Sequence, residues 1–406
     1  MITNNVNKPE LLAPAGNLEK LKYAIHYGAD AVYIGGRNYS LRANNDNFTL
    51  DEIKEACLYA HKHNARIYVT VNIIFHDRDV EGLKEYLISL DECGVDAVIV
   101  SDPLVIQLLK EIGSKMEIHL STQQSTLNYE AALYWKNEGV TRIVLAREAS
   151  GSNIKEIIDK TGLEVEVFIH GAMCSGYSGR CVLSNYLTMR DSNRGGCSQI
   201  CRWSFELWDE EARKVSNDGN YAIAPKDLSM LRYIPDLIDM GVKSFKIEGR
   251  MRSIYYIATM LHTYRKVIDE YCDNKSTYEY NKDYEKILYR CANRDTVPQF
   301  FEHKPGLFEQ YYIGRDEVSN QDFLGVVLDY DEKAKEVVIE QRNFFKIGDE
   351  VEIFGPKIDN HLFKIEYIKD NKGNLLDAAR HPRQIIRVPL NIKVEKNDLM
   401  RIKLSG

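Results

Sequence analysis

Residues 27–36 read YGADAVYIGG, and the same pattern returns as CGVDAVIVSD at 93–102, EGVTRIVLAR at 138–147 and MGVKSFKIEG at 240–249. Each copy begins where a helix would end, continues through a glycine, and runs into β-branched residues. A glycine after the last helical turn readily adopts a positive φ, and a continuous β-branched run is typical of a buried parallel strand. The pattern therefore predicts a helix, a tight turn and a parallel strand, four times over.

Four further strands are predicted between these copies. They are LLAP at 11–14, RIYVTVN at 66–72, EIHLSTQ at 117–123 and EVEVFIHG at 164–171. Helix starts lie between the strands, for example at Thr49 with Glu52 as in a capping box, and at Asp102 before Pro103. Eight such units in right-handed succession close into a (β/α)8 TIM-type barrel more readily than they form an open sheet. We expect the barrel, and a doubly wound open sheet is the alternative.

The pattern changes near Lys304-Pro305-Gly306, after two helical stretches at 253–271 and 282–291. Beyond it, short alternating strands are separated by turns: FLGVVLDYD at 323–331, KEVVIEQ at 335–341, GDEVEIFG at 348–355 and FKIEYIKD at 363–370. We therefore predict two domains. The TIM-type barrel with its trailing helices takes residues 1–304, and a small C-terminal antiparallel β-barrel, of a kind that often binds RNA, takes residues 305–406.

The composition narrows the class of protein. The chain has 406 residues, 44% hydrophobic residues and a formal net charge of −7, which argues against non-specific coating of nucleic acid. A local RNA-contacting face is still compatible with that charge, and the candidate is Arg380, Arg383, Arg387, Lys393, Lys396, Arg401 and Lys403. A solvated strand face is the alternative for this run. The sequence has neither a signal-peptide pattern nor a long apolar segment, so we expect a cytoplasmic protein without membrane contact.

Four of the eight cysteines cluster between the seventh and eighth predicted strands. They are Cys174 and Cys181 in MCSGYSGRCVLS, and Cys197 and Cys201 in GGCSQICRW. This part of a TIM barrel is its C-terminal rim, where such enzymes have their active sites. Thiolates bind zinc or iron–sulfur clusters, and the wide gap of the first pair favours a 4Fe-4S cluster held by the loop 174–201, with zinc as the alternative.

Residues 166–184, EVFIHGAMCSGYSGRCVLS, match in full the pattern E-x-F-x-x-G-A-hydrophobic-C-x4-G-x-C-x-hydrophobic-S. This pattern marks the collagenase-like peptidase family U32. The chain resembles that family along the whole barrel, at ELLAPAGN from Glu10, AVYIGG from Ala31, LRA from Leu41, LSTQ from Leu120 and FKIEGRMRS from Phe245. One barrel with one C-terminal β-domain is similar to the family branch that makes 5-hydroxyuridine at the wobble position of tRNA.

This resemblance implies an enzyme with tRNA as substrate and prephenate as a small carboxylate co-substrate. It further implies an iron–sulfur cluster on the four clustered cysteines and a paralogous family subunit as a further partner. The family name implies the first alternative, a peptidase, although the sequence contains neither H-E-x-x-H nor G-x-S-x-G. The second alternative is an RNA-binding scaffold in which the cluster is structural.

The predicted strand ends supply the other site residues. A guanidinium there can bind a carboxylate bidentately, so the candidate catalytic residues are Arg250 as clamp, Glu248 beside it, and His170 as acid or base. Candidate substrate-binding residues are Arg42, Asn72, Gln123, Arg147 and Arg180. The alternatives are structural: an ion pair of Arg250 with Glu248 or Glu148, packing for His170, and loop anchoring for the polar side chains.

Overall fold

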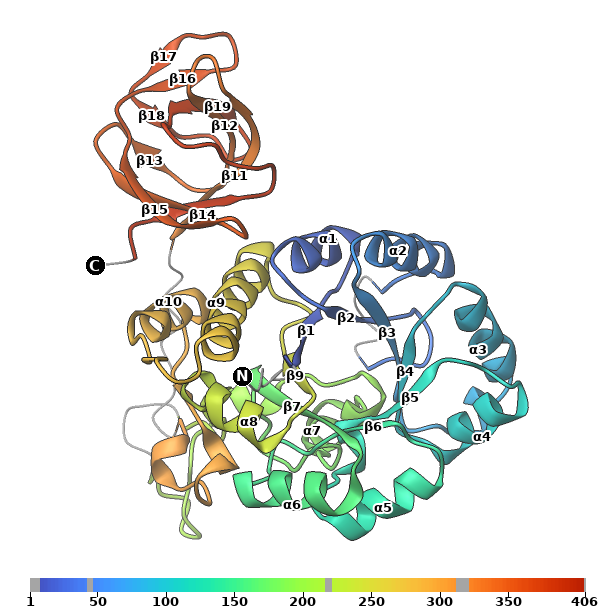
Figure 1. Cartoon of the computed structure of the whole chain (residues 1–406). Coiled ribbons are helices and arrows are strands. Elements are labelled where there is room, and N and C mark those ends of the chain that lie inside the picture. Colours follow the sequence, from blue (N-terminus) through green and yellow to red (C-terminus); the bar gives the residue numbers. More distant parts are fainter. Residues whose placement is uncertain (1–7, 42–46, 216–220, 312–320, 405–406) are drawn as a thin grey trace.

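The computed structural model describes residues 8–41, 47–215, 221–311 and 321–404. Eight parallel strands form a closed barrel, in which each strand pairs with the next (Figure 1). They are β1 (Glu10–Pro14), β2 (Ala31–Gly35), β3 (Arg66–Val71), β4 (Ala97–Val100), β5 (Glu117–Leu120), β6 (Arg142–Val144), β7 (Glu164–Gly171) and β9 (Ser244–Ile247). β9 pairs in parallel with both β7 and β1 and so closes the ring. The predicted (β/α)8 barrel is confirmed, and the open sheet is excluded.

Helices surround the barrel (Figure 1). They are α1 (Leu18–His26), α2 (Leu50–Lys62), α3 (Leu83–Glu92), α4 (Pro103–Glu111), α5 (Tyr129–Asn137), α6 (Gly151–Thr161), α8 (Ile234–Met240) and α9 (Ile254–Asp273). The capping box at Thr49 and the Asp102 cap before Pro103 are present as predicted. The glycine of each repeated pattern has a positive φ, from 83° at Gly94 to 92° at Gly28. This local rule explains why the strands could be found from sequence.

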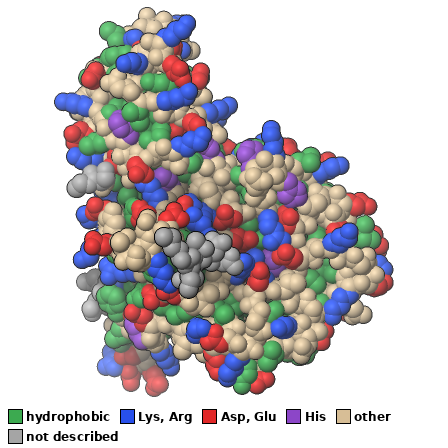
Figure 2. All heavy atoms as spheres, in the orientation of Figure 1, with side chains coloured by type: hydrophobic (Ala, Val, Ile, Leu, Met, Phe, Trp, Pro, Cys, Tyr) green, Lys and Arg blue, Asp and Glu red, His purple; other side chains and the backbone are tan. Residues whose placement is uncertain are grey.

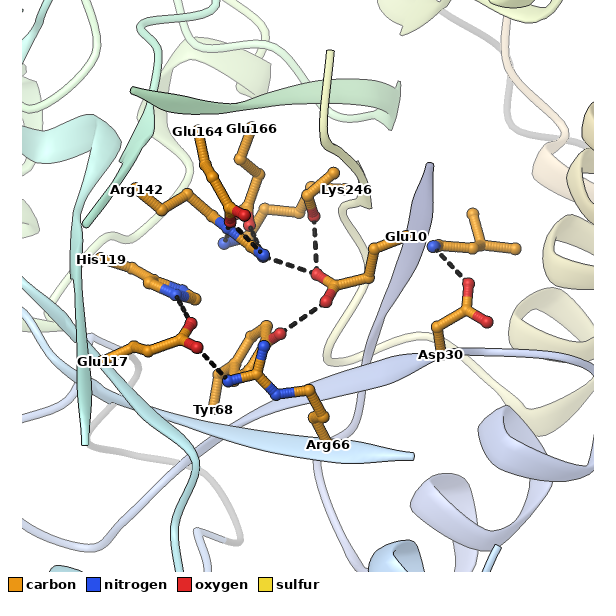
Figure 3. Close-up of polar contacts among 12 residues, drawn as sticks. Glu10, Asp30, Arg66, Tyr68, Glu117, His119, Arg142, Glu164, Glu166 and Lys246 are labelled. Carbon is orange, nitrogen blue, oxygen red and sulfur yellow. Dashed lines mark hydrogen bonds and ion pairs between the residues drawn. The ribbon is translucent and has the colours of Figure 1, made fainter. Parts of the chain in front are cut away.

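Charged side chains fill the N-terminal end of the barrel, which the sequence reasoning missed (Figure 3). Arg142, only 2% exposed, donates to Glu10 at 2.6 Å and to Glu164 at 2.8 Å. Tyr68 donates to the other oxygen of Glu10 at 2.6 Å. Strands β1, β6 and β7 each contribute their first residue to this group, so its ion pairs hold non-adjacent strands together. A buried charge needs such partners, because desolvation without them is strongly unfavourable.

The C-terminal domain follows α10 (Asp283–Ala292) and is an antiparallel sheet, as predicted. Its strands run in the spatial order β15 (Ile358–Lys364), β14 (Glu350–Gly355), β20 (Leu399–Ile402), β11 (Phe323–Asp331), β12 (Glu336–Gln341), β19 (Ile385–Pro389), β16 (Ile368–Asp370) and β17 (Leu375–Leu376). A second pair joins β13 (Phe345–Lys346) to β18 (Ala378–Ala379). The domain packs on α1 and α9, where Tyr255 stacks on Phe323 at 5.0 Å and Tyr27 donates to the Asn397 carbonyl at 3.1 Å.

The predicted basic face of this domain is largely paired with acidic side chains. Arg401 is buried and lies 3.0 Å from Glu352, while Arg387 lies 3.6 Å from Asp331. Arg380, Lys393 and Lys403 form further ion pairs. On the face in Figure 2, basic and acidic side chains are interspersed over both domains. These pairings favour the solvated strand face over a dedicated RNA surface, since most of the positive charge is already balanced.

Candidate functional site

A pocket with a volume of about 120 Å³ opens at the C-terminal ends of the barrel strands. We call it the rim pocket, and it is lined by Tyr33, Leu41, Thr70, Asn72, Ile99, Ser121, Thr122, Arg147, Phe168, Lys246, Glu248 and Arg250. Four predicted site residues therefore meet here, namely Asn72, Arg147, Glu248 and Arg250. Three of the lining side chains are cationic and one is acidic, which suits a small anion.

Arg250 is fixed against the loop after β2. It is 7% exposed, and its guanidinium donates to the Ser40 hydroxyl at 3.1 Å and to the Leu41 carbonyl. Gly35 makes room for it, because a Cβ at that position would lie 2.1 Å from Arg250 Nη1. Glu148, a suggested ion-pair partner, instead accepts hydrogen bonds from the backbone and hydroxyl of Ser178. The surroundings thus hold the Arg250 side chain at the pocket wall.

Asn72 and Arg147 both line the rim pocket. The Asn72 amide donates to the Ser121 hydroxyl at 3.1 Å and so links the ends of β3 and β5. The Arg147 guanidinium lies 4.0 Å from the centre of the Phe168 ring, a cation–π contact. Phe168 lines the same pocket, so this contact holds the guanidinium at the pocket wall.

Lys246 was not predicted as a site residue, although it lies in the FKIEGR motif. It comes from the middle of β9, points into the barrel, and is 4% exposed. Its ammonium group lies 2.7 Å from Glu166 of β7 and 4.5 Å from the centre of the Tyr33 ring. Burial lowers the pKa of Lys246. Burial opposes ionisation of Glu166 as well, but Lys246 and Arg142 bring the pKa of that carboxyl below its usual range.

Gln123 and Arg180 lie in a neighbouring cavity of about 250 Å³, the side pocket, together with Ser101, Asp102 and Gln124. Arg180 Nε donates to the Ser125 hydroxyl at 3.2 Å. The cysteine segment, residues 174–201, touches the end of β5 here. Gly179 has φ +74°, and a Cβ on it would lie 2.1 Å from the Gln123 carbonyl oxygen. Arg42, the remaining predicted binding residue, lies outside the described residues.

His170 is a residue of β7 that does not line the rim pocket, and its side chain contacts α9. A register shift after Phe168 turns this part of β7, and the His170 Nδ1 lies 3.2 Å from the Tyr264 hydroxyl. The side chain is 1% exposed, and burial lowers its pKa to about 4. A neutral, enclosed imidazole beside a tyrosine fits the packing alternative. The chemistry of the rim pocket therefore has to come from other residues.

The four clustered cysteines are free thiols; Cys174 is exposed and the other three are half-buried. Burial raises the pKa of Cys201, and the neighbouring Cys197 and Cys181 contribute to the increase. Gly176 packs closely on Cys181, since an added Cβ would lie 3.2 Å from the Cys181 Cβ. Within the described ranges no three His, Cys, Asp or Glu side chains are grouped to hold a metal ion. Four free thiols on one segment have the donor chemistry that an iron–sulfur cluster requires.

The cysteine segment is nevertheless tied to the rim pocket. The Ser178 hydroxyl accepts a hydrogen bond from the backbone N–H of Arg147 at 3.3 Å, so the segment reaches the end of β6. Glu148 holds the same serine. A group bound by the cysteines would therefore be close to the pocket wall that Arg147 forms.

None of the described helices combines the length and the hydropathy that a membrane-spanning helix needs.

Comparisons with known proteins cover nearly the whole chain. The model of "Peptidase family U32" matches residues 16–310, and that of the "Peptidase family U32 C-terminal domain" matches residues 319–401. "tRNA hydroxylation protein P1" of Bacillus subtilis is 51% identical over 97% of this chain and 94% of its own. "tRNA hydroxylation protein P" of Escherichia coli is 32% identical over 96% and 95%. "Collagenase" of Porphyromonas gingivalis is 29% identical over 97% of each chain.

Proposed function

This chain belongs to peptidase family U32, and from its similarity to relatives named tRNA hydroxylation proteins we propose that it is an enzyme that hydroxylates C5 of the wobble uridine of cytoplasmic tRNA. The observation that supports this best is the position of the rim pocket beside the cysteine segment. A small pocket at a barrel rim can hold a small co-substrate close to a base that is presented from outside. Two relatives named tRNA hydroxylation proteins match this chain over 94% and 95% of their own lengths.

Prephenate is the proposed co-substrate, and the rim pocket is its proposed site. Prephenate carries two carboxylates, and Arg147 and Arg250 both present guanidinium groups to this pocket. Guanidinium groups bind carboxylates through paired, charge-assisted hydrogen bonds. Asn72 and Ser121 add uncharged hydrogen-bonding groups to the lining, which would orient the bound molecule.

Cys174, Cys181, Cys197 and Cys201 are the proposed ligands of a 4Fe-4S cluster. Such a cluster supplies one-electron chemistry when bound. What the chain itself provides is position: Ser178 holds the cysteine segment against Arg147, and Gly179 lets it approach the end of β5. The side pocket next to this contact, with Gln123 and Arg180, is the proposed place for the tRNA base.

The test is nucleoside mass spectrometry of tRNA from a deletion strain complemented with wild-type, Cys174→Ala or Arg250→Ala protein. Wild-type protein should restore 5-hydroxyuridine derivatives, whereas each variant should restore less than about a tenth of them. Iron and sulfide analysis of anaerobically purified protein should show iron in wild type and little in Cys174→Ala. Unchanged tRNA in the deletion strain would refute the proposed function.

Proteolysis is the second candidate, because one relative is named "Collagenase". It predicts that the same purified protein cleaves gelatin or native collagen and that Cys174→Ala or another thiol variant abolishes the cleavage. Proteolysis by the purified protein, together with unchanged tRNA modification in the deletion strain, would replace the first proposal. A protein that restores tRNA hydroxylation and leaves both protein substrates intact would exclude it.

A further inference from the structure

We propose that Lys246 is the third anion-binding residue of the rim pocket, that it contacts a carboxylate of a small dicarboxylate, and that Glu166 is the positioning residue that holds it there. This proposal rests on the proposed function only in taking the rim pocket as the site of the carboxylate co-substrate. The binding step itself can be measured without tRNA.

The ammonium group of Lys246 is placed for such a contact. It lies in the pocket floor with the rings of Tyr33 and Phe168 at 4.5 Å and 5.5 Å from their centres. Among the described residues its one hydrogen-bond partner is Glu166, at 2.7 Å. An ammonium group has three N–H donors, so donors are left for a ligand. The apolar rings exclude water from the group, which strengthens a charge-assisted hydrogen bond to a carboxylate.

Glu166 is fully buried, and its side chain does not line the rim pocket itself. One carboxylate oxygen binds Lys246, and the other lies 3.5 Å from Arg142, whose closer partners are Glu10 and Glu164. Glu166 therefore favours the charged form of Lys246, against the effect of burial on its pKa, and fixes the direction of its side chain. The two residues come from the two family motifs, E-x-F in β7 and FKIEGR in β9, and strand pairing sets Phe168 opposite Lys246.

The charges of the rim pocket favour an anion, and the positions of its cations favour one with two carboxylates. Arg147, Lys246 and Arg250 line it, against Glu248 alone. Glu166 lies beneath the lining and offsets one of these positive charges. The net charge of these five groups is +1, so the pocket attracts an anion. The cations belong to different places, since Arg147 follows β6, Lys246 lies within β9 and Arg250 follows β9, so that two carboxylates of one ligand can each bind a cation. The alternative is that Lys246 and Glu166 are only a barrel ion pair, which binds nothing.

The test is calorimetric titration of the anaerobically purified, full-length protein with acetate, succinate and prephenate. Wild type should bind at least one dicarboxylate more tightly than acetate. Lys246→Met should weaken that binding at least tenfold, whereas Lys246→Arg should retain it within a few-fold. Lys275→Met is the matched control, because Lys275 also pairs with a carboxylate, that of Asp239 at 2.6 Å, and lies over a tyrosine ring, but outside the pocket.

Lys246→Met leaves Glu166 buried without its main partner and can fail to fold. The double variant Glu166→Gln with Lys246→Met removes one charge of each sign, so it leaves the net charge of the barrel interior unchanged and should show the same loss of binding. Glu166→Gln alone should shift the upper pH limit of binding downward, because Lys246 then faces Arg142 and Arg147 without a carboxylate. Tyr33, a phenol, lies on the remaining side.

Unchanged dicarboxylate affinity in the folded double variant or in Lys246→Met would overturn the proposal, as would wild-type protein that binds no dicarboxylate. Loss of binding in these variants, together with unchanged tRNA modification in the deletion strain, would uphold the role of Lys246 and refute tRNA hydroxylation. Restored tRNA hydroxylation by a variant with normal binding would do the reverse.

Discussion

Arg194 Nη1 lies 2.6 Å from Asp79 Oδ2, so the cysteine segment is tied to the loop after β3. The second guanidinium nitrogen donates to the other Asp79 oxygen at 2.9 Å, which makes the pair bidentate. Such a pair has a defined geometry and keeps two loops in one arrangement. The segment that carries the proposed ligands is therefore held at both sides of the rim, by Asp79 and by Glu148 through Ser178.

Asp79→Asn should loosen the cysteine segment. Hydrogen bonds to charged groups contribute about 1.5–3 kcal/mol each, so local opening of residues 190–201 should become easier by roughly that amount. Hydrogen exchange measured by mass spectrometry should show faster exchange in this segment and unchanged exchange in β1–β6. Arg194 lowers the pKa of Asp79 to about 2, so the wild-type tie should persist above pH 4 and weaken as pH falls towards 2. Equal exchange in wild type and variant would show that the pair does not restrain the segment.

Gly35→Ala should remove the Arg250 clamp without removing Arg250. The new Cβ would lie 2.1 Å from Arg250 Nη1 and 2.4 Å from Ser40 Oγ, so the guanidinium has to move. Dicarboxylate affinity and tRNA hydroxylation should both fall at least tenfold. Gly306→Ala is the control, since its Cβ would meet its nearest atom at 3.9 Å. Full binding in Gly35→Ala protein would mean that Arg250 does not need its present position.

The barrel could be predicted from sequence because its signal is local and repeated. Each of four glycines has a positive φ and lies three residues before the first residue of a strand, namely Gly28, Gly94, Gly139 and Gly241. The predicted strand ends then identified four residues of the rim pocket, since parallel strands of a barrel end at one rim. These are Asn72, Arg147, Glu248 and Arg250. No long-range information was needed for these residues.

Lys246 and Glu166 were missed because their relation depends on strand register across 80 residues. A lysine in the apolar run SFKI and a glutamate in EVEVF are visible as charges inside buried strands, and that was the available signal. His170 was predicted as an acid or base at a strand end. The register shift after Phe168 places its side chain towards α9, and a shift of this kind leaves no clear mark in the sequence. The arrangement of the four thiols depends on loop packing, so spacing alone predicts the ligand type and no more.

Gly179→Ala should displace the cysteine segment from the end of β5. The position has φ +74°, and an added Cβ would lie 2.1 Å from the Gln123 carbonyl oxygen, so backbone has to move. Iron content and tRNA hydroxylation should each fall to less than about a fifth of wild type. Gly162→Ala is the control for backbone strain without a steric clash, because φ there is +62° and nothing lies within 4 Å of the added Cβ. That control should lose about 1–2 kcal/mol of stability and keep its iron.

His170 should influence stability at low pH and leave the reaction unchanged. Its pKa is lowered by burial to about 4, below the value of about 6.5 in an unfolded chain, so the unfolded state binds the proton first. The folded state is therefore unaffected above pH 6.5 and loses up to about 3 kcal/mol as pH falls from 6.5 to 4, since each pKa unit corresponds to about 1.4 kcal/mol. His170→Gln, which can still bond Tyr264, should flatten this part of the curve of unfolding free energy against pH. It should also restore tRNA hydroxylation within about threefold of wild type, because His170 does not line the rim pocket. A loss of more than tenfold at pH 7.5, in a variant of unchanged stability, would return His170 to the reacting groups.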